Sequence, residues 1–140
     1  MRLRWYSVVV DAHDVSAQAR WWADVLDWQV LFDTPDEAVI IPRDLPEEYT
    51  GKPIPAASWH RIGPGMVFVP VREEKQVKNR LHIDLAPHLE DDRDAQIRRL
   101  LERGATLADV GQDDAEDEVS WTVLRDPEGN EFCVLSSRDL

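Results

Sequence analysis

The chain has 140 residues, the size of one domain, and a formal net charge of −12 from 16 basic and 28 acidic side chains. A chain this acidic repels nucleic acid and anionic membrane, so neither is expected as a partner. The single cysteine, Cys133, excludes a disulfide within the chain, and no targeting segment or membrane-spanning run is visible. We therefore expect a cytoplasmic protein.

The first half of the chain predicts a strand, a helix and three further strands. Asp14 is placed to cap the helix, and apolar residues recur at helical spacing from Val15 to Leu26. Residues 42–65 hold five of the nine prolines and three of the six glycines, so a long loop is expected before the last strand. The expected strands are residues 5–10, 29–32, 38–41 and 66–71.

The second half repeats this order. Asp91 or Asp92 can cap its helix, and Gly104 is placed to end that helix in the left-handed conformation. Residues 126–130, DPEGN, predict a tight turn because proline fixes φ early and glycine accepts positive φ late. The acidic residues 113–118 lack the spacing of a calcium loop and predict a solvated loop. The expected strands are residues 81–86, 105–110, 121–125 and 131–135.

Each half therefore has the order strand, helix, strand, strand, strand. The predicted fold is α+β, with two βαβββ modules (about 1–72 and 78–138) in one domain that spans residues 1–140. Two such modules form a curved mixed sheet with the helices outside and a concave ligand cavity. Pairing of the modules within one chain and swapping between two chains are both open.

This element order, with DPEGN before the last strand, resembles the vicinal oxygen chelate superfamily of glyoxalases, extradiol dioxygenases, epimerases and bleomycin-resistance proteins. The segments NRLHIDLAP (79–87) and WTVLRDPEGNEFCVL (121–135) are most similar to glyoxalase-like proteins of the kind common in actinobacteria. The resemblance covers nearly the whole chain. It implies the fold and does not specify an activity.

The resemblance also implies four metal-ligand positions on the concave face. They fall on Ser7, on Phe68 or Val69 (the register of residues 66–71 is open), on His82 and on Cys133. His82 is a good ligand and Cys133 stands where the metal enzymes usually carry glutamate, whereas the other positions offer poor donors or none. A metal would need His82, Cys133 and Glu131 or Asp84 to converge.

Strand alternation places polar and aromatic side chains on the concave side of the predicted sheet. His82 either lines a pocket or is structural, and Cys133 is either a small buried filler or a ligand. Trp59 in the loop either stacks on a ligand or anchors the loop, and Trp121 either packs or contacts a ligand. The candidate ligand-binding residues are Trp5, Ser7, Trp59, His60, Arg80, His82, Asp84, Trp121, Glu131 and Cys133.

We expect a metal-free small-molecule-binding protein of glyoxalase and bleomycin-resistance fold, with no cofactor. The alternative is a lyase or isomerase that uses His82 as general base, oriented by Asp84, or as a ligand of a divalent metal (zinc, nickel, manganese or iron). The expected partners are a small-molecule ligand and a second copy of the chain, because each half-sheet leaves edges to cover.

Overall fold

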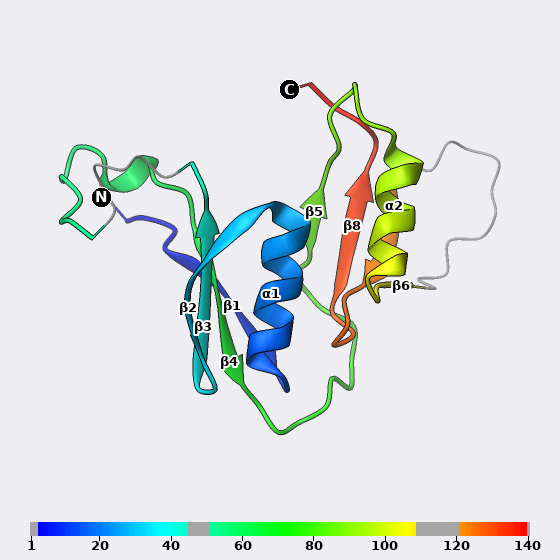
Figure 1. The fold of residues 1–140 in the computed structure, drawn as a ribbon, viewed down its shortest axis with the longest axis horizontal. Helices are drawn as coiled ribbons and strands as arrows, with labels where there is room; N and C mark the ends of the chain where they lie inside the picture. The colour runs from blue at the N-terminus through cyan, green and yellow to red at the C-terminus, as the bar shows by residue number, and fades with distance from the viewer. Residues whose placement is uncertain (1–2, 45–50, 109–120, 140) are drawn as a thin grey trace. The chain divides into compact units, whose positions relative to one another are not determined.

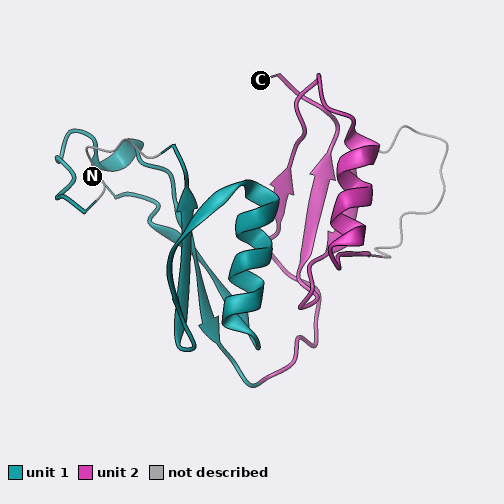
Figure 2. Cartoon of the chain, in the orientation of Figure 1, with its two compact units in different colours: residues 1–72 teal, residues 73–140 magenta. Residues whose placement is uncertain are grey.

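The structure is a computed structural model and describes residues 3–44, 51–108 and 121–139. It divides into two compact units, Met1–Arg72 and Glu73–Leu140, coloured teal and magenta in Figure 2. Among the described residues, no helix is long and apolar enough to cross a bilayer. The predicted acidic loop 113–118 and part of the predicted loop 42–65 lie outside the described residues.

The first unit is a four-stranded sheet with one long helix on one of its faces (Figure 1). The strand order is β1-β4-β3-β2, with β1 parallel to β4 and the other neighbours antiparallel. A 3-10 turn, η2, lies within the predicted loop. The elements are β1 (Ser7–Ala12), α1 (Val15–Leu26), β2 (Trp28–Thr34), β3 (Glu37–Pro42), η2 (Trp59–Arg61) and β4 (Gly65–Pro70).

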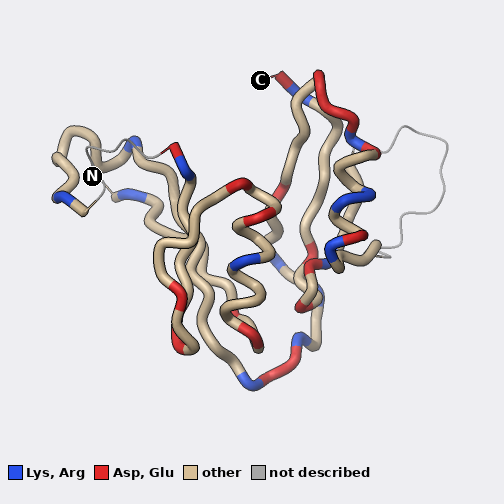
Figure 3. The backbone as a smooth tube through the Cα atoms, viewed as in Figure 1, with Lys and Arg blue, Asp and Glu red and all other residues tan. Residues whose placement is uncertain are grey.

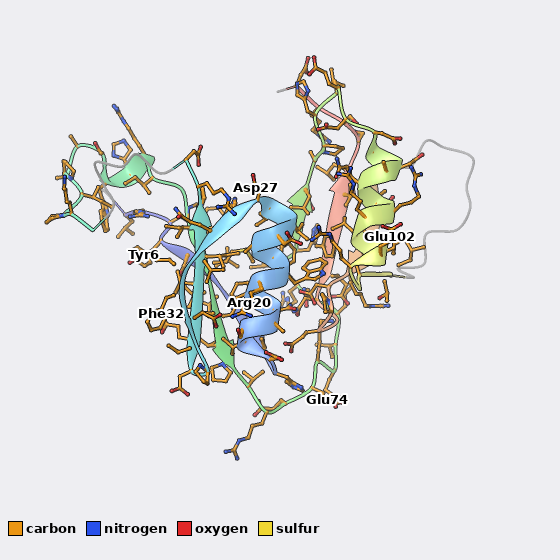
Figure 4. The ribbon with its side chains drawn as sticks, viewed as in Figure 1. Tyr6, Arg20, Asp27, Phe32, Glu74 and Glu102 are labelled. Atoms are coloured by element: carbon orange, nitrogen blue, oxygen red, sulfur yellow. The ribbon has the colours of Figure 1, made fainter. Side chains whose placement is uncertain are left out.

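Helix α1 begins where the sequence predicts. The Asp14 carboxylate accepts the Ala17 N–H at 3.0 Å, and the helix ends at Asp27, which adopts a positive φ of 53°. The apolar face of α1, which includes Trp22 and Ala19, is buried, and so are alternate residues of β3 and β4. The core of this unit therefore lies between α1 and the face of the sheet that α1 covers. Figure 4 shows Phe32 on the side of the sheet away from α1.

The second unit has the same strand order as the first. Its sheet runs β5-β8-β7-β6, with β5 parallel to β8 and the other neighbours antiparallel. This repeat confirms the predicted α+β fold of two βαβββ modules, and in the described residues each module forms its own open four-stranded sheet. The elements are β5 (Ile83–Leu85), α2 (Arg93–Glu102), β6 (Thr106–Leu107), β7 (Trp121–Arg125) and β8 (Glu131–Leu135).

The turn between β7 and β8 is held by one buried carboxylate. Asp126 Oδ1 accepts the N–H groups of Glu128 and Asn130, each at 3.0 Å, and Gly129 has a φ of 88°. Asp92 rather than Asp91 caps α2, and Gly104 after the helix has a φ of 102°. The predicted turn and helix end are therefore confirmed, and the turn sets the register of the two strands that carry the site.

Two strands of the second unit are shorter than predicted. Strand β5 begins at Ile83, so His82 precedes the strand instead of lying inside it. The segment before it is held by Asn79, whose backbone and side chain bond to Glu131 without forming a β ladder. Strand β6 covers only Thr106–Leu107, and residues 109–110 of the predicted strand lie outside the described residues.

Candidate functional site

One side of the second sheet carries most of the candidate residues. Val123 of β7 and Asp84 of β5 both pair with Cys133 of β8, so the three side chains project from the same side. On the opposite side the strands are buried, and Arg93 of α2 bonds the Thr122 hydroxyl there. We call the side away from α2 the Cys133 face; its β7 and β8 residues are Trp121, Val123, Arg125, Glu131, Cys133 and Leu135.

His82, Asp84 and Cys133 meet on this face. His82 Nδ1 lies 2.9 Å from Asp84 Oδ1 and 3.7 Å from Cys133 Sγ. An ionised carboxylate only accepts, so Nδ1 carries the proton in the bond to Asp84. The side chains of His82 and Asp84 are each 47% exposed, whereas Cys133 is buried beneath them. The imidazole and carboxylate are therefore accessible to a ligand, and the thiol forms the floor below them.

The environment of Cys133 keeps its thiol protonated. Burial raises the pKa of the Cys133 thiol, the charge of Asp84 and its hydrogen bond raise that pKa further, and the positive charge of Lys78 opposes them. From the sequence, Glu131 is the neighbour expected to raise this pKa. The structure shows that Asp84 does so instead, since Glu131 is engaged elsewhere. A thiol in this state is a weak nucleophile.

Glu131 is buried and fixes the segment before His82. Its carboxylate accepts the Asn79 N–H at 3.0 Å and the Lys75 ammonium at 2.9 Å. Burial alone would raise the pKa of Glu131, but these two bonds, a bond from its own backbone N–H and the positive charge of Lys75 together lower the pKa. The sequence offers Glu131 as a metal ligand with His82 and Cys133; the structure gives it two other partners and puts Asp84 beside that pair.

Four candidates lie in the first unit and have other surroundings. Trp5 is 67% exposed and its indole N–H donates to the Ser7 carbonyl at 3.3 Å. Trp59 lies 6.4 Å from the Tyr6 ring, with the Arg4 guanidinium 5.0 Å from the Trp59 ring centre, which is the arrangement of a loop anchor. Ser7 is on β1, and His60 is exposed in η2.

The structure resolves the register of residues 66–71. In β4, Val69 pairs with Asp11 and projects from the same side of the sheet as Ser7. Phe68 is 0% exposed on the opposite side, with the core that α1 covers. Phe68 is therefore excluded as the second ligand position, which falls on Val69. In the second unit, Arg80 is exposed and Trp121 is 42% exposed on the Cys133 face.

These residues do not fit the four-ligand metal centre of the superfamily. Val69 has no donor atom, and the hydroxyl of Ser7 is a poor ligand. In the described part of the chain, one group of donors does converge: one ligand atom each of His82, Asp84 and Cys133 lie within 4.8 Å of one another. This mixture of nitrogen, oxygen and sulfur suits zinc better than magnesium or manganese.

Sequence reasoning missed the basic and amide side chains around Glu131. Lys75 and Asn79 precede the predicted strand in a stretch without periodicity, so no local pattern links them to Glu131. Arg125 could have been found, since a hairpin closed by the DPEGN turn pairs the residue before the turn with the one after it. Arg125 is thereby placed opposite Glu131 on the Cys133 face.

Solved structures with the same fold include three enzymes or resistance proteins. An oxidase, ChaP-H2, is 19% identical with a TM-score of 0.59, covering 99% of this chain and 96% of that one. A glyoxalase/bleomycin resistance/dioxygenase family enzyme from Burkholderia phytofirmans PsJN is 16% identical with a TM-score of 0.64, covering 97% and 100%. A mutant of the fosfomycin resistance protein FosX from Listeria monocytogenes, solved with Mn(II) and a dihydroxypropylphosphonic acid, is 10% identical with a TM-score of 0.65, covering 99% and 93%.

At these identities the likeness extends to the fold alone. Among curated protein sequences, none is significantly similar to this chain. A family model described as a glyoxalase-like domain matches residues 7–135, which include every helix and strand given above and the whole Cys133 face. The chain therefore belongs to the glyoxalase-like domain family.

Proposed function

We propose that this protein binds a small, partly polar molecule on the Cys133 face, by direct contact and without a metal. The observation that carries the proposal is the His82–Asp84 pair, which is bonded at 2.9 Å and 47% exposed on both side chains. An exposed pair of this kind contributes about 1 kcal/mol or less to the free energy of unfolding. A stabilising role alone therefore does not explain why the two side chains are paired here. Trp121 on the same face offers an aromatic surface for the apolar part of a ligand.

The test is a fragment screen by ligand-observed NMR on the wild type and on the variants His82→Ala and Trp121→Ala. Fragments that bind the wild type are expected to lose most of their signal with His82→Ala. The free energy of unfolding of that variant should change by about 1 kcal/mol or less, because the side chain is half exposed. His88→Ala, at another exposed histidine, is the matched control. Fragments that bind all the variants equally would contradict the proposal.

A second candidate function is a lyase or isomerase in which His82 is the general base. The bond from His82 Nδ1 to Asp84 favours it, since it fixes the imidazole with Nε2 as the free nitrogen that can take a proton from a substrate. A divalent metal held by His82, Asp84 and Cys133 would instead polarise a substrate oxygen. In that version the three side chains are ligands, and His82 is not the base.

Elemental analysis of protein purified without chelator separates direct binding from metal binding. If the ligand binds directly, the content of zinc, nickel, manganese and iron should be well below one ion per chain. That metal content should be the same in the variant Cys133→Ser. Near-stoichiometric metal that disappears in Cys133→Ser and in His82→Ala would establish the metal version. Cobalt(II) titration gives a second readout, because a cobalt–thiolate bond adds an absorption band that requires Cys133.

We also propose that the protein is a cytoplasmic homodimer. Its single cysteine suits a reducing compartment. Edge strands of an open sheet present unpaired backbone groups that a second copy can cover.

A further inference from the structure

Basic side chains lie near one end of the Cys133 face, although the chain carries −12 in total. Basic and acidic residues are mixed along the segment that leads from β4 into the second unit (Figure 3). The buried carboxylate of Glu131 at this end is already matched by the Lys75 ammonium at 2.9 Å. Further cations at this end are therefore not needed to neutralise it.

Arg125 is such a further cation. It pairs with Glu131 across the β7–β8 hairpin, and its Nε forms a long ion pair of 4.0 Å with the Glu131 oxygen that Lys75 already bonds, beyond hydrogen-bond distance. Its side chain is 40% exposed. The guanidinium keeps donors that can form a two-point contact with another carboxylate.

Lys78 supplies positive charge on the other side of β8. It is exposed in the segment before β5, and it directly precedes Asn79, whose N–H bonds the Glu131 carboxylate at 3.0 Å. Its positive charge also lowers the pKa of the Cys133 thiol, against the raising effects of burial and Asp84. An anion above β8 at the Glu131 end thus meets Arg125 from the β7 side and Lys78 from the β5 side. The Asp84 carboxylate would repel such an anion. Asp84, however, pairs with Cys133, which is two residues beyond Glu131 on β8 and therefore away from this end of the face.

The opposite end of the face is apolar. At this end Trp121 pairs with Leu135. Val123, which pairs with Cys133, lies between Trp121 and Arg125 on β7. A strand rises about 3.3 Å per residue, so the positions of Trp121 and Arg125 are about 13 Å apart. The face is polarised along the strands, from cationic at Arg125 to aromatic at Trp121.

We propose that the molecule bound on the Cys133 face is an amphipathic carboxylate, with its carboxylate held by Arg125 and Lys78 and its apolar body lying over Val123 and Cys133 toward Trp121. This proposal rests on the proposed binding function and adds the chemical class and orientation of the ligand. His82 and Asp84 border the middle of this path, where they can contact a polar group on the body of the ligand.

The test uses three probes of one shape: phenylbutyrate, its neutral amide and the corresponding phenylbutylamine. Calorimetry or NMR titration on the full chain should show phenylbutyrate binding about tenfold more tightly than the amide, because a charged hydrogen bond to arginine is worth more than a neutral one. The amine should bind most weakly. Added salt should weaken the binding of phenylbutyrate and leave that of the amide unchanged.

Charge-removing variants locate the carboxylate. Arg125→Gln and Lys78→Gln should each weaken phenylbutyrate binding several-fold and leave amide binding unchanged, whereas Arg99→Gln, on exposed α2, should change neither. Equal affinity for acid and amide, or an equal effect of Arg99→Gln, would overturn the carboxylate proposal and leave small-molecule binding intact. Absence of binding by all three probes, with no hit in the fragment screen, would overturn both.

Discussion

Cys133 is the only cysteine of the chain, so its chemical reactivity reports on the Cys133 face without ambiguity. Burial and then the Asp84 carboxylate raise its pKa above the ordinary 9.0. Because the thiolate is the reacting form, we expect slow alkylation by iodoacetamide at pH 8 and a midpoint of the rate above pH 9.0. Asp84→Asn should lower that midpoint and speed alkylation at fixed pH by about three- to tenfold.

Mass spectrometry of the alkylated chain between pH 7 and 11 measures this rate. Asp94→Asn, which removes an exposed carboxylate of α2, is the matched control and should leave the rate unchanged. A midpoint at or below 9.0 in the wild type would contradict the described environment of the thiol. Phenylbutyrate should slow alkylation in the wild type, because its proposed position covers the thiol.

Residue by residue, the sequence predicts which side chains share a face and not which groups they bond. Strand alternation places Asp84 with His82, and Glu131 with Cys133, on single strands. The engagement of Glu131 by Lys75 and Asn79 depends on a segment more than fifty residues away along the chain, as their separations of 56 and 52 residues show. No local pattern carries that information, so the sequence leaves Glu131 and Asp84 as equal candidates beside Cys133.

At the scale of elements, helix α2 is docked on its sheet by one arginine. Arg93 Nε donates to the Leu135 carbonyl at 2.9 Å, and its Nη2 donates to the Val134 carbonyl at 2.9 Å and to the Thr122 hydroxyl at 2.7 Å. Arg93→Gln cannot reach all three acceptors, so we expect a loss of about 2–3 kcal/mol in the free energy of unfolding. Urea denaturation measures it, with Arg98→Gln, at an exposed position of the same helix, as control. Equal stability of the two variants would show that packing alone docks the helix.

Asp33 of β2 ties its strand to helix α1. The Ser16 hydroxyl lowers the pKa of Asp33, burial opposes it, and Arg20 lowers it further, so the folded pKa is below the ordinary 3.8. A depressed carboxyl pKa contributes stability that is fully present above pH 3.8 and is lost as pH falls through the folded value. The difference in melting temperature between the wild type and Asp33→Asn should therefore be constant near neutral pH and shrink below pH 3.8.

Thermal melts from pH 2 to 7 check this dependence on Asp33. Asp36→Asn, in the exposed turn after β2, is the matched control, and its difference from the wild type should not follow the same profile. A difference that grows as the pH falls would have the opposite sign and would contradict the described bonds of Asp33.

Elements with strong local signals are predicted well. Strands β7 and β8 match their predicted bounds, and both helices start after the predicted caps, because alternation and capping are encoded within a few residues. The register of β4 was open because Met66, Val67, Phe68 and Val69 are all apolar and both faces of the strand look alike. Pairing with β1, which places Val69 opposite Asp11, decides it.

At the scale of the whole molecule, the two modules have one strand order, which the repeated element order of the sequence predicts. The chemistry is not repeated. On the side of the first sheet that carries Ser7 and Asp11, the positions Val67 and Val69 of β4 are apolar. In the second sheet, β8 instead brings Cys133 beside Asp84 of β5. The cluster of candidate residues in the second module is therefore not reproduced in the first.

The homodimer is the prediction that depends on the whole molecule. Strand β2 lies at the end of the first sheet, and Val30, Leu31 and Phe32 in it are 41%, 60% and 48% exposed beside an irregularity in the pairing with β3. An exposed apolar edge strand is a site where another chain adds, and a second copy of this chain would cover both the backbone and the side chains. Light scattering at micromolar concentration should give about twice the 16.1 kDa of one chain.

A charge at this edge tests where the copies meet. Leu31→Lys keeps an exposed position exposed, so the fold should be unaffected, but burying the ammonium between two copies is costly and the dimer should dissociate at higher concentration. Val77→Lys, at a 77% exposed position outside the strands, is the matched control and should leave the dimer intact. A monomeric wild type would refute the dimer. If both variants remain dimeric, the β2 edge is excluded as the dimer interface. The interface would then lie at another strand edge.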